Sequence, residues 1–61
     1  MHFEVVTKKT TNGTLYHARI VGGNNEIIFA SQNYTAKASA KHACEVVKAN
    51  AASAQIYEVD A

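Results

Sequence analysis

The sequence lacks several features that commonly stabilise small proteins. It contains no proline and no tryptophan, and Cys44 is its single cysteine, so no disulfide can form within one chain. Below roughly 70–80 residues a hydrophobic core rarely supplies more than about 3–5 kcal/mol, and small domains usually add disulfides, a metal or a partner chain. With 61 residues, one domain covering residues 1–61 is expected, and oligomerisation is the remaining way to stabilise it.

Metal ligands are few and widely separated. His2, His17 and His42 fall in a terminus, a predicted strand and a predicted helix, without the paired spacing of a zinc site. His42 and Cys44 stand two positions apart, about 200° round a helix, so they cannot hold one ion together. Neither a metal nor a cofactor is expected.

Charge and hydropathy argue against two further classes of protein. Six basic residues oppose five acidic ones, and the net charge of +1 gives no bulk attraction to nucleic acid or to an anionic membrane. No apolar run approaches the roughly 18 residues of a membrane span, and the start, Met1-His2-Phe3-Glu4, is no signal peptide. A soluble cytoplasmic protein with a reduced cysteine is therefore expected.

Alternating apolar and polar residues predict a first hairpin. Residues 3–9 and 14–21 alternate with period two around Asn12-Gly13, a typical two-residue hairpin turn because both positions tolerate positive φ. With this pair as the turn, Val5 is expected opposite Ile20. One face then carries Phe3, Val5, Tyr16, Ala18 and Ile20, and the other is mixed.

The stretch from residue 22 to residue 31, GGNNEIIFAS, predicts a second hairpin. With Asn24-Asn25 as the turn pair, Ile20 is expected opposite Phe29 and Val21 opposite Ile28. The third strand is then apolar on both faces. One helix cannot cover both faces, so a partner is expected to cover part of the second.

Residues 35–50 predict a helix, because they are rich in alanine and lysine and contain no glycine or proline. Thr35 is expected as the N-cap and Asn50 as a residue at the C-terminal end. The apolar stripe of this helix consists of Ala36, Ala40, Ala43, Cys44, Val47 and Ala51. Its position on this stripe predicts that Cys44 is buried and chemically inert.

Residues 54–59, AQIYEV, predict a fourth strand, with Ile56 and Tyr57 on opposite faces. The order is β-β-β-α-β. This order predicts an α+β fold in which an antiparallel sheet packs with one helix.

An ordered set of residues resembles the YegP-like family of small proteins, from about Phe3 to about Asn50. The matching features are Phe3-Glu4, Gly13, Tyr16, Arg19-Ile20, Asn24, Glu26-Ile27-Ile28, Ser31, Tyr34, Lys37-Ala38, Ala40 and Val47-Lys48. The chain departs from the family pattern in having Asn24-Asn25 for Asn-Gly, Ser31-Gln32 for Ser-Glu, and His42-Ala43-Cys44 for Asn-Gly-Ile. The last departure replaces a large apolar residue with Cys44.

The resemblance implies a β(3)-α-β unit, found either as a tandem repeat or as a homodimer whose two units share a sheet and exchange C-terminal strands. A chain with one unit is then expected to be the dimer. The resemblance implies no catalytic residues, because no activity is established for the family.

Three functions remain to be compared. The sequence favours a homodimeric binding or structural module without catalysis. A weak nucleic-acid-binding domain is the alternative, with Lys8, Lys9, His17 and Arg19 as one basic patch. Arg19 has a second, structural interpretation, which is an ion pair across the strands with Glu4. An enzyme has no support, because no serine lies in a nucleophile elbow and Cys44 lies in mid-helix.

The candidate binding residues lie on the second predicted strand, where the sheet leads into the helix, and on the first half of the helix. They are Arg19, Asn24, Gln32, Asn33, Tyr34, Lys37 and Lys41. A polar cluster of this kind could bind a peptide or a small ligand. The simpler interpretation is that its polar residues satisfy free backbone groups near the helix start.

Overall fold

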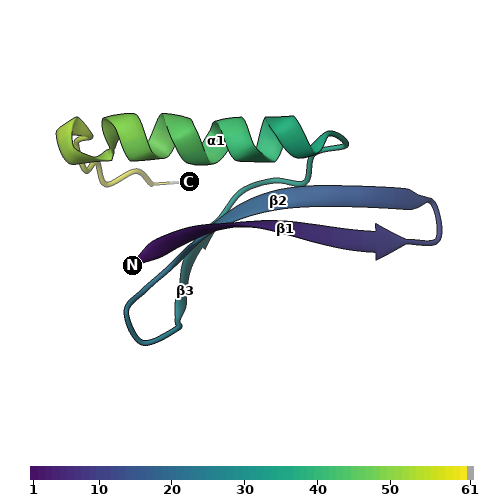
Figure 1. Ribbon diagram of the computed structural model, residues 1–61. Helices are drawn as coiled ribbons and strands as arrows, with labels where there is room; N and C mark the ends of the chain where they lie inside the picture. The colour runs from purple at the N-terminus through teal and green to yellow at the C-terminus, as the bar shows by residue number, and fades with distance from the viewer. Residues whose placement is uncertain (61) are drawn as a thin grey trace.

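The computed structural model describes residues 1–60, and it shows an antiparallel sheet with one helix across one face (Figure 1). The sheet has three strands in the order β1-β2-β3, comprising β1 (His2–Thr10), β2 (Gly13–Val21) and β3 (Ile27–Ala30). The helix α1 (Lys37–Asn50) is followed by one 3-10 turn, η1 (Ala51–Ser53). The expected α+β class is confirmed.

The first hairpin is closed by a turn one residue earlier than predicted. Thr10 pairs with Gly13, so Thr11-Asn12 is the turn, and Val5 lies opposite Ala18 instead of Ile20. The predicted register was therefore wrong by two residues. The positive φ of 135° belongs to Gly13, and Thr10 Oγ1 donates a hydrogen bond to the Gly13 carbonyl at 2.7 Å. A slip of two residues keeps every side chain on its face, so the predicted faces of β1 and β2 stand.

The backbone at Gly13 makes it a sensitive position for substitution. Because φ is +135° there and a Cβ atom at this position would meet nothing within 4 Å, Gly13→Val would suffer from backbone strain alone. We expect a loss of about 1–3 kcal/mol in the free energy of unfolding. Gly23→Ala is the matched control, because Gly23 is equally open and has no positive φ. Equal denaturation midpoints for the two variants would contradict the assigned turn.

The second hairpin has a three-residue loop. The Asn25 amide donates to the Gly22 carbonyl at 3.0 Å, and the Gly22 amide donates to the Glu26 carbonyl at 2.7 Å. Asn25 has φ of 65°, as expected for the last residue of such a loop. The predicted two-residue turn at Asn24-Asn25 was therefore wrong, and the pairing at the start of β3 changes with it.

Ile20 pairs with Phe29, as predicted, but Val21 pairs with Ile27 instead of Ile28. Because the loop has three residues, the pair next to it is shifted by one residue relative to the pairs farther along the two strands. An irregularity between the two pairs leaves Ile28 as the extra residue of a β-bulge. The bulge restores the register in which Phe29 shares the helix-facing side of the sheet with Ile20.

Replacing Asn25 with glycine is expected to be tolerated. Asn25 occupies the left-handed region, which glycine adopts without steric cost, and its loop hydrogen bond comes from the backbone. We expect Asn25→Gly to change the free energy of unfolding by less than about 1 kcal/mol, in the neutral or stabilising direction. Asn25→Val should destabilise in the same urea titration. A clear loss in Asn25→Gly would show that the asparagine side chain is needed.

The N-cap of α1 lies one residue later than expected. Ala36 is the N-cap, with extended backbone and no side-chain cap hydrogen bond, so the assignment of Thr35 was wrong. Asn50 ends α1, as predicted, and its Nδ2 donates to the Val46 carbonyl at 2.8 Å. No helix in residues 1–60 is long and apolar enough to cross a membrane.

The core between helix and sheet is thin. Its buried apolar residues are Ala18, Val21 and Ala40, and no large side chain within residues 1–60 is fully buried. Cys44, which was expected to be buried, is half-buried. Small residues on α1 bring the helix close to the sheet at Ala40, which is 0% exposed, but they do not fill the space on either side of it.

The link from β3 to α1 forms backbone hydrogen bonds with β2. The Tyr16 amide donates to the Tyr34 carbonyl at 2.9 Å, and the Tyr34 amide donates back at 2.7 Å. Nearer β3, the Ser31 amide donates to the Ala18 carbonyl at 2.8 Å. The link therefore continues the edge of the sheet past the end of β3 and then crosses to the helix.

The predicted fourth strand is absent from the single chain. Residues 54–60 have no strand pairing in the described structure, and Ile56, Tyr57 and Val59 are 96%, 76% and 80% exposed. A strand needs a neighbouring strand for its backbone hydrogen bonds, and this segment has none within the described chain. Strand formation by residues 54–59 therefore stays a prediction for an assembly of two chains.

Candidate functional site

The residues expected to form a polar binding site do not form one cluster. Gln32, Asn33 and Tyr34 lie in the link between β3 and α1, whereas Asn24 lies in the turn at the other end of β3. Asn24 is engaged locally, because its Oδ1 accepts from the Glu26 amide at 3.2 Å. Binding at any of these residues stays a prediction.

The two candidate lysines, Lys37 and Lys41, are exposed and lie one turn apart at the start of α1. Arg19 is in a different place. It lies on β2 directly opposite Glu4, and its Nε donates to Glu4 Oε1 at 2.7 Å. The structural interpretation of Arg19, a cross-strand ion pair, is thus confirmed.

Glu4 accepts two hydrogen bonds on the face of the sheet away from the helix. His2 Nε2 lies 2.9 Å from Glu4 Oε2, and Arg19 Nε lies 2.7 Å from Glu4 Oε1. The hydrogen bonds from His2 and then Arg19 lower the pKa of Glu4 below its usual value of 4.5. The carboxylate is therefore kept ionised by contacts that the unfolded chain lacks.

These contacts predict a pH dependence of stability. A group with a lowered pKa in the folded state contributes its stabilisation in full above its unfolded pKa and loses it as pH falls through the folded value. The stabilisation by Glu4 should therefore be present above pH 4.5 and fade below it. The unfolding free energies of wild type and Glu4→Gln should differ at neutral pH and converge in acid. A difference that persists unchanged in acid would exclude this origin.

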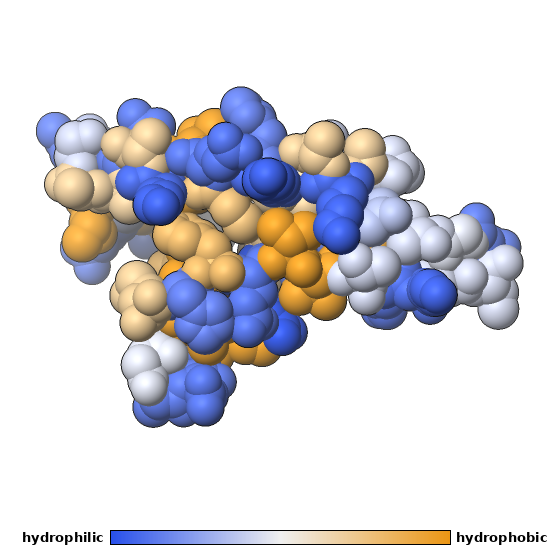
Figure 2. Space-filling model, viewed as in Figure 1, coloured by the Kyte–Doolittle hydropathy of each residue, from blue (hydrophilic) through white to orange (hydrophobic). Residues whose placement is uncertain are grey.

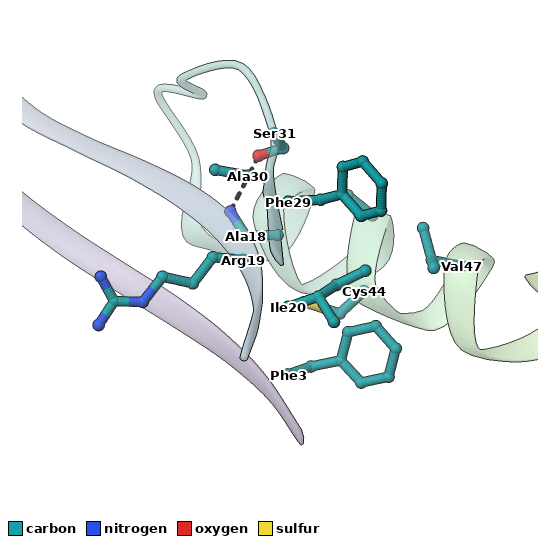
Figure 3. Close-up of a pocket in the computed structure, with 10 residues that line it drawn as sticks. Phe3, Ala18, Arg19, Ile20, Phe29, Ala30, Ser31, Cys44 and Val47 are labelled. Atoms are coloured by element: carbon teal, nitrogen blue, oxygen red, sulfur yellow. Dashed lines mark hydrogen bonds between the residues drawn. The ribbon is translucent and has the colours of Figure 1, made fainter. Parts of the chain in front are cut away.

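An apolar hollow lies between the sheet and α1 (Figure 3). Phe3, Ile20 and Phe29 line it from the sheet, and Ala43, Cys44 and Val47 line it from the helix. Its volume is about 160 Å³, close to the roughly 150 Å³ of a cavity that holds benzene. Figure 2 shows the matching hydrophobic surface gathered between α1 and the sheet.

The polar side chains at the rim of the hollow are already engaged. Ser31 Oγ accepts from the Ala18 amide at 2.9 Å and donates to the Gln32 carbonyl at 2.8 Å. Arg19 points away from the apolar side chains, toward Glu4 (Figure 3). The hollow therefore offers apolar contact and no free hydrogen-bonding side chain.

A second depression, here called the helix groove, continues from the hollow along α1. It shares Ala43 and Val47 with the hollow and is also lined by Tyr34, His42 and Val46. Its volume is about 600 Å³. Val46 and Val47 are 46% and 39% exposed, so the apolar surface of α1 extends beyond the part that contacts the sheet.

Sequence reasoning did not find the hollow. The signal was present, because three large side chains of the sheet, Phe3, Ile20 and Phe29, face a helix whose stripe is mostly alanine. Small residues on a helix permit its close approach to a sheet. They do so at Ala40, but around Cys44 the same small volumes leave space unfilled.

The arrangement offers little for chemistry on a substrate. Cys44 borders the apolar hollow from the middle of α1, away from the helix N-terminus that would activate a thiol. Within residues 1–60, no group of three His, Cys, Asp or Glu side chains is placed to hold a metal ion. The described surface thus presents exposed apolar side chains next to the outer edge of β3, with which no strand of residues 1–60 pairs.

Comparison with known proteins agrees with the resemblance seen in the sequence. Residues 12–58 match the family described as a domain of unknown function, DUF1508. UPF0339 protein YegP of Yersinia pestis is 38% identical over 58 residues, which cover 95% of this chain and 49% of YegP. UPF0339 protein Atu0232 of Agrobacterium fabrum is 43% identical over 44 residues, covering 72% of this chain and 71% of Atu0232.

The chain spans about half the length of YegP and most of the length of Atu0232. The unit described here thus occurs in relatives of two different sizes. Because the family match covers most of the chain, the protein belongs to the YegP-like family whose domain is described as DUF1508, a domain of unknown function.

Proposed function

We propose that the protein is a homodimeric binding or structural module without catalytic activity. Residues 54–59 of each chain add a strand to the free edge of β3 in the partner. The observation that carries this proposal is the amount of large apolar surface left open by one chain. The exposed side chains, apart from Met1, are Ile27, Ile28, Phe29, Val46, Val47, Ile56, Tyr57 and Val59.

This exposure is unusual because the open apolar side chains outnumber those of the core. Single exposed apolar residues are normal, but contiguous apolar patches mark interaction surfaces. The three buried apolar residues of the described chain include two alanines. A dimer that buries the open side chains would gain the core that a chain of 61 residues lacks.

The edge of β3 is suited to receiving a strand. It pairs with β2 on one side, and no strand among residues 1–60 pairs with its other side. Its four residues, IIFA, carry none of the charges or prolines that natural proteins place on exposed edges to prevent pairing. Exchange of an identical segment between two chains gives a closed, symmetric dimer at low cost.

The relatives support an assembly of two units. YegP is about twice as long as the part that this chain matches, so one polypeptide there has room for two such units. Two copies of a single-unit chain would form an assembly of the same size as YegP. On this proposal the functional unit contains two chains.

Thermal unfolding at several protein concentrations tests the dimer. Because unfolding then releases two chains, the melting temperature should rise as the protein concentration rises. Glu4→Gln is a useful control, since its site faces away from the hollow and should lower stability without removing the concentration dependence. A melting temperature independent of concentration would contradict the dimer.

A second candidate function, weak binding of nucleic acid, is favoured by the shape of the first hairpin. The hairpin extends beyond the helix, and its tip is polar (Figures 1 and 2). Lys8 and Lys9 are exposed there and make no ion pair with residues 1–60. They lie on opposite faces of a two-stranded ribbon, and such a ribbon can enter a groove of DNA.

A salt titration separates this candidate from the first. If Lys8 and Lys9 contact phosphates, the logarithm of DNA affinity should fall with the logarithm of salt concentration by about 0.9 for each contact. Lys8→Glu with Lys9→Glu should abolish binding and leave the dimer intact. Binding that is absent at low salt, or unaffected by the double substitution, would exclude this role for the hairpin.

A further inference from the structure

The hollow between the sheet and α1 is incomplete in one chain. Phe29 forms one wall from β3 and is 69% exposed, and Val47 forms the facing wall from α1 and is 39% exposed. Figure 3 shows both side chains at the hollow, together with Ile20, Cys44 and Phe3. A native core side chain normally touches neighbours on all sides, so these two walls lack a common neighbour.

We propose that this hollow is the socket for the side chain of Ile56 from a second copy of the chain. The proposal rests on the proposed dimer and specifies which residue anchors it. The hollow has the volume of one apolar side chain, about 160 Å³. Ile56 is 96% exposed, more than any other large apolar side chain of the described residues, so its burial changes its environment most.

The position of the socket fits a strand added to β3. Neighbouring strands lie about 4.8 Å apart, and alternate side chains of a strand point to the same face. A strand paired with the outer edge of β3 would thus place every second side chain on the same face as Phe29, toward α1. Phe29 and Val47 line the hollow from β3 and α1, and both are exposed enough to contact such a side chain.

Chemistry selects Ile56 over the adjacent aromatic residue. Tyr57 points to the opposite face of the same strand, and its hydroxyl needs a hydrogen-bond partner when buried. The polar side chains at the hollow are Ser31 and Arg19, and both are engaged elsewhere. Val59 shares the face of Tyr57, so the strand has Ile56 as the large apolar residue of its other face.

Cys44 provides a direct probe, because it lines the socket and is the single cysteine. We would prepare Ile56→Cys and oxidise it mildly. A disulfide needs Cβ atoms about 3.5–4.5 Å apart, so efficient bonding requires residue 56 to enter the socket. The expected product is a covalent dimer with disulfides between Cys44 and the new cysteine of the other chain, located by peptide mapping.

Tyr57→Cys is the matched control, because it moves the thiol one residue along to the opposite face. It should form this disulfide at least tenfold more slowly than Ile56→Cys. Faster bonding at position 57 would overturn the assignment of the anchor. A disulfide within one chain at position 56 would overturn the second copy as the occupant. No disulfide to Cys44 in a protein that is dimeric by mass would reject the socket and leave the proposed dimer standing.

Thiol labelling gives an independent measurement in the absence of an added cysteine. With Ile56 in the socket, Cys44 of the wild type should react slowly in the native state and faster after unfolding. Ile56→Ala should increase the native labelling rate at least tenfold, whereas Tyr57→Ala should change it little. Equal rates for wild type and Ile56→Ala, in folded proteins, would contradict the proposal.

Discussion

Deleting residues 54–61 is expected to abolish both folding and dimerisation. The deletion removes Ile56, Tyr57 and Val59, each of which would contribute about 1.5–3 kcal/mol if buried against the partner. A domain of this size rarely has more than about 3–5 kcal/mol of stability, so the combined loss exceeds what the remaining core can supply. Circular dichroism and sedimentation should show an unfolded chain.

A shorter deletion serves as the control for this experiment. Removing residues 60–61 keeps the whole segment 54–59 and should leave both the spectrum and the mass of the assembly unchanged. A folded monomer after deletion of residues 54–61 would contradict the proposed dimer, because residues 1–53 would then have a sufficient core without any partner.

The second large effect is expected at Phe29. In the single chain this side chain is 69% exposed, and substitutions of exposed residues usually change stability by less than about 0.5 kcal/mol. In the dimer the same side chain would be covered by the added strand, and loss of a buried phenylalanine costs about 3–5 kcal/mol. Phe29→Asp should therefore dissociate or unfold the protein, since it also places a charge at the interface.

Thr11→Asp provides the comparison for Phe29→Asp. Thr11 lies in the exposed turn of the first hairpin, where aspartate is a common residue. It introduces the same charge away from the proposed interface and should leave the melting temperature nearly unchanged. If both variants melt like the wild type, Phe29 is as exposed in solution as it is in one chain, and the strand is not added at β3.

The elements with strong local signals could be predicted from the sequence. Period-two alternation located β1 and β2, and the turn residues before Ile27 located the second hairpin. The faces of the first hairpin were also predicted correctly, because an error of two residues preserves the alternation. Glu4 and Arg19 lie directly opposite in the ladder, and their predicted ion pair forms.

The errors arose where several local solutions have similar energies. Both Thr11-Asn12 and Asn12-Gly13 can form a two-residue turn, and the choice depends on the φ of Gly13 and on one hydroxyl hydrogen bond from Thr10. The bulge at the start of β3 depends on a loop of three residues in place of two. The N-cap falls at Ala36 instead of Thr35, two residues after the link pairs with β2 at Tyr34.

The candidate site was harder to predict because it is defined by missing volume. Residue identity indicates which side chains face the helix, but not whether they meet it. The polar residues Gln32, Asn33 and Asn24 drew attention as possible ligands, yet the structure separates them along the chain between the two ends of β3. The hollow instead depends on the spacing between α1 and the sheet, which no local pattern encodes.

The most direct test of the proposed dimer is the mass of the native protein in solution, measured by light scattering or sedimentation equilibrium at micromolar concentration. We expect twice the chain mass of 6.6 kDa, with dissociation and unfolding occurring together on dilution. A stable, folded species with the mass of one chain would contradict the dimer.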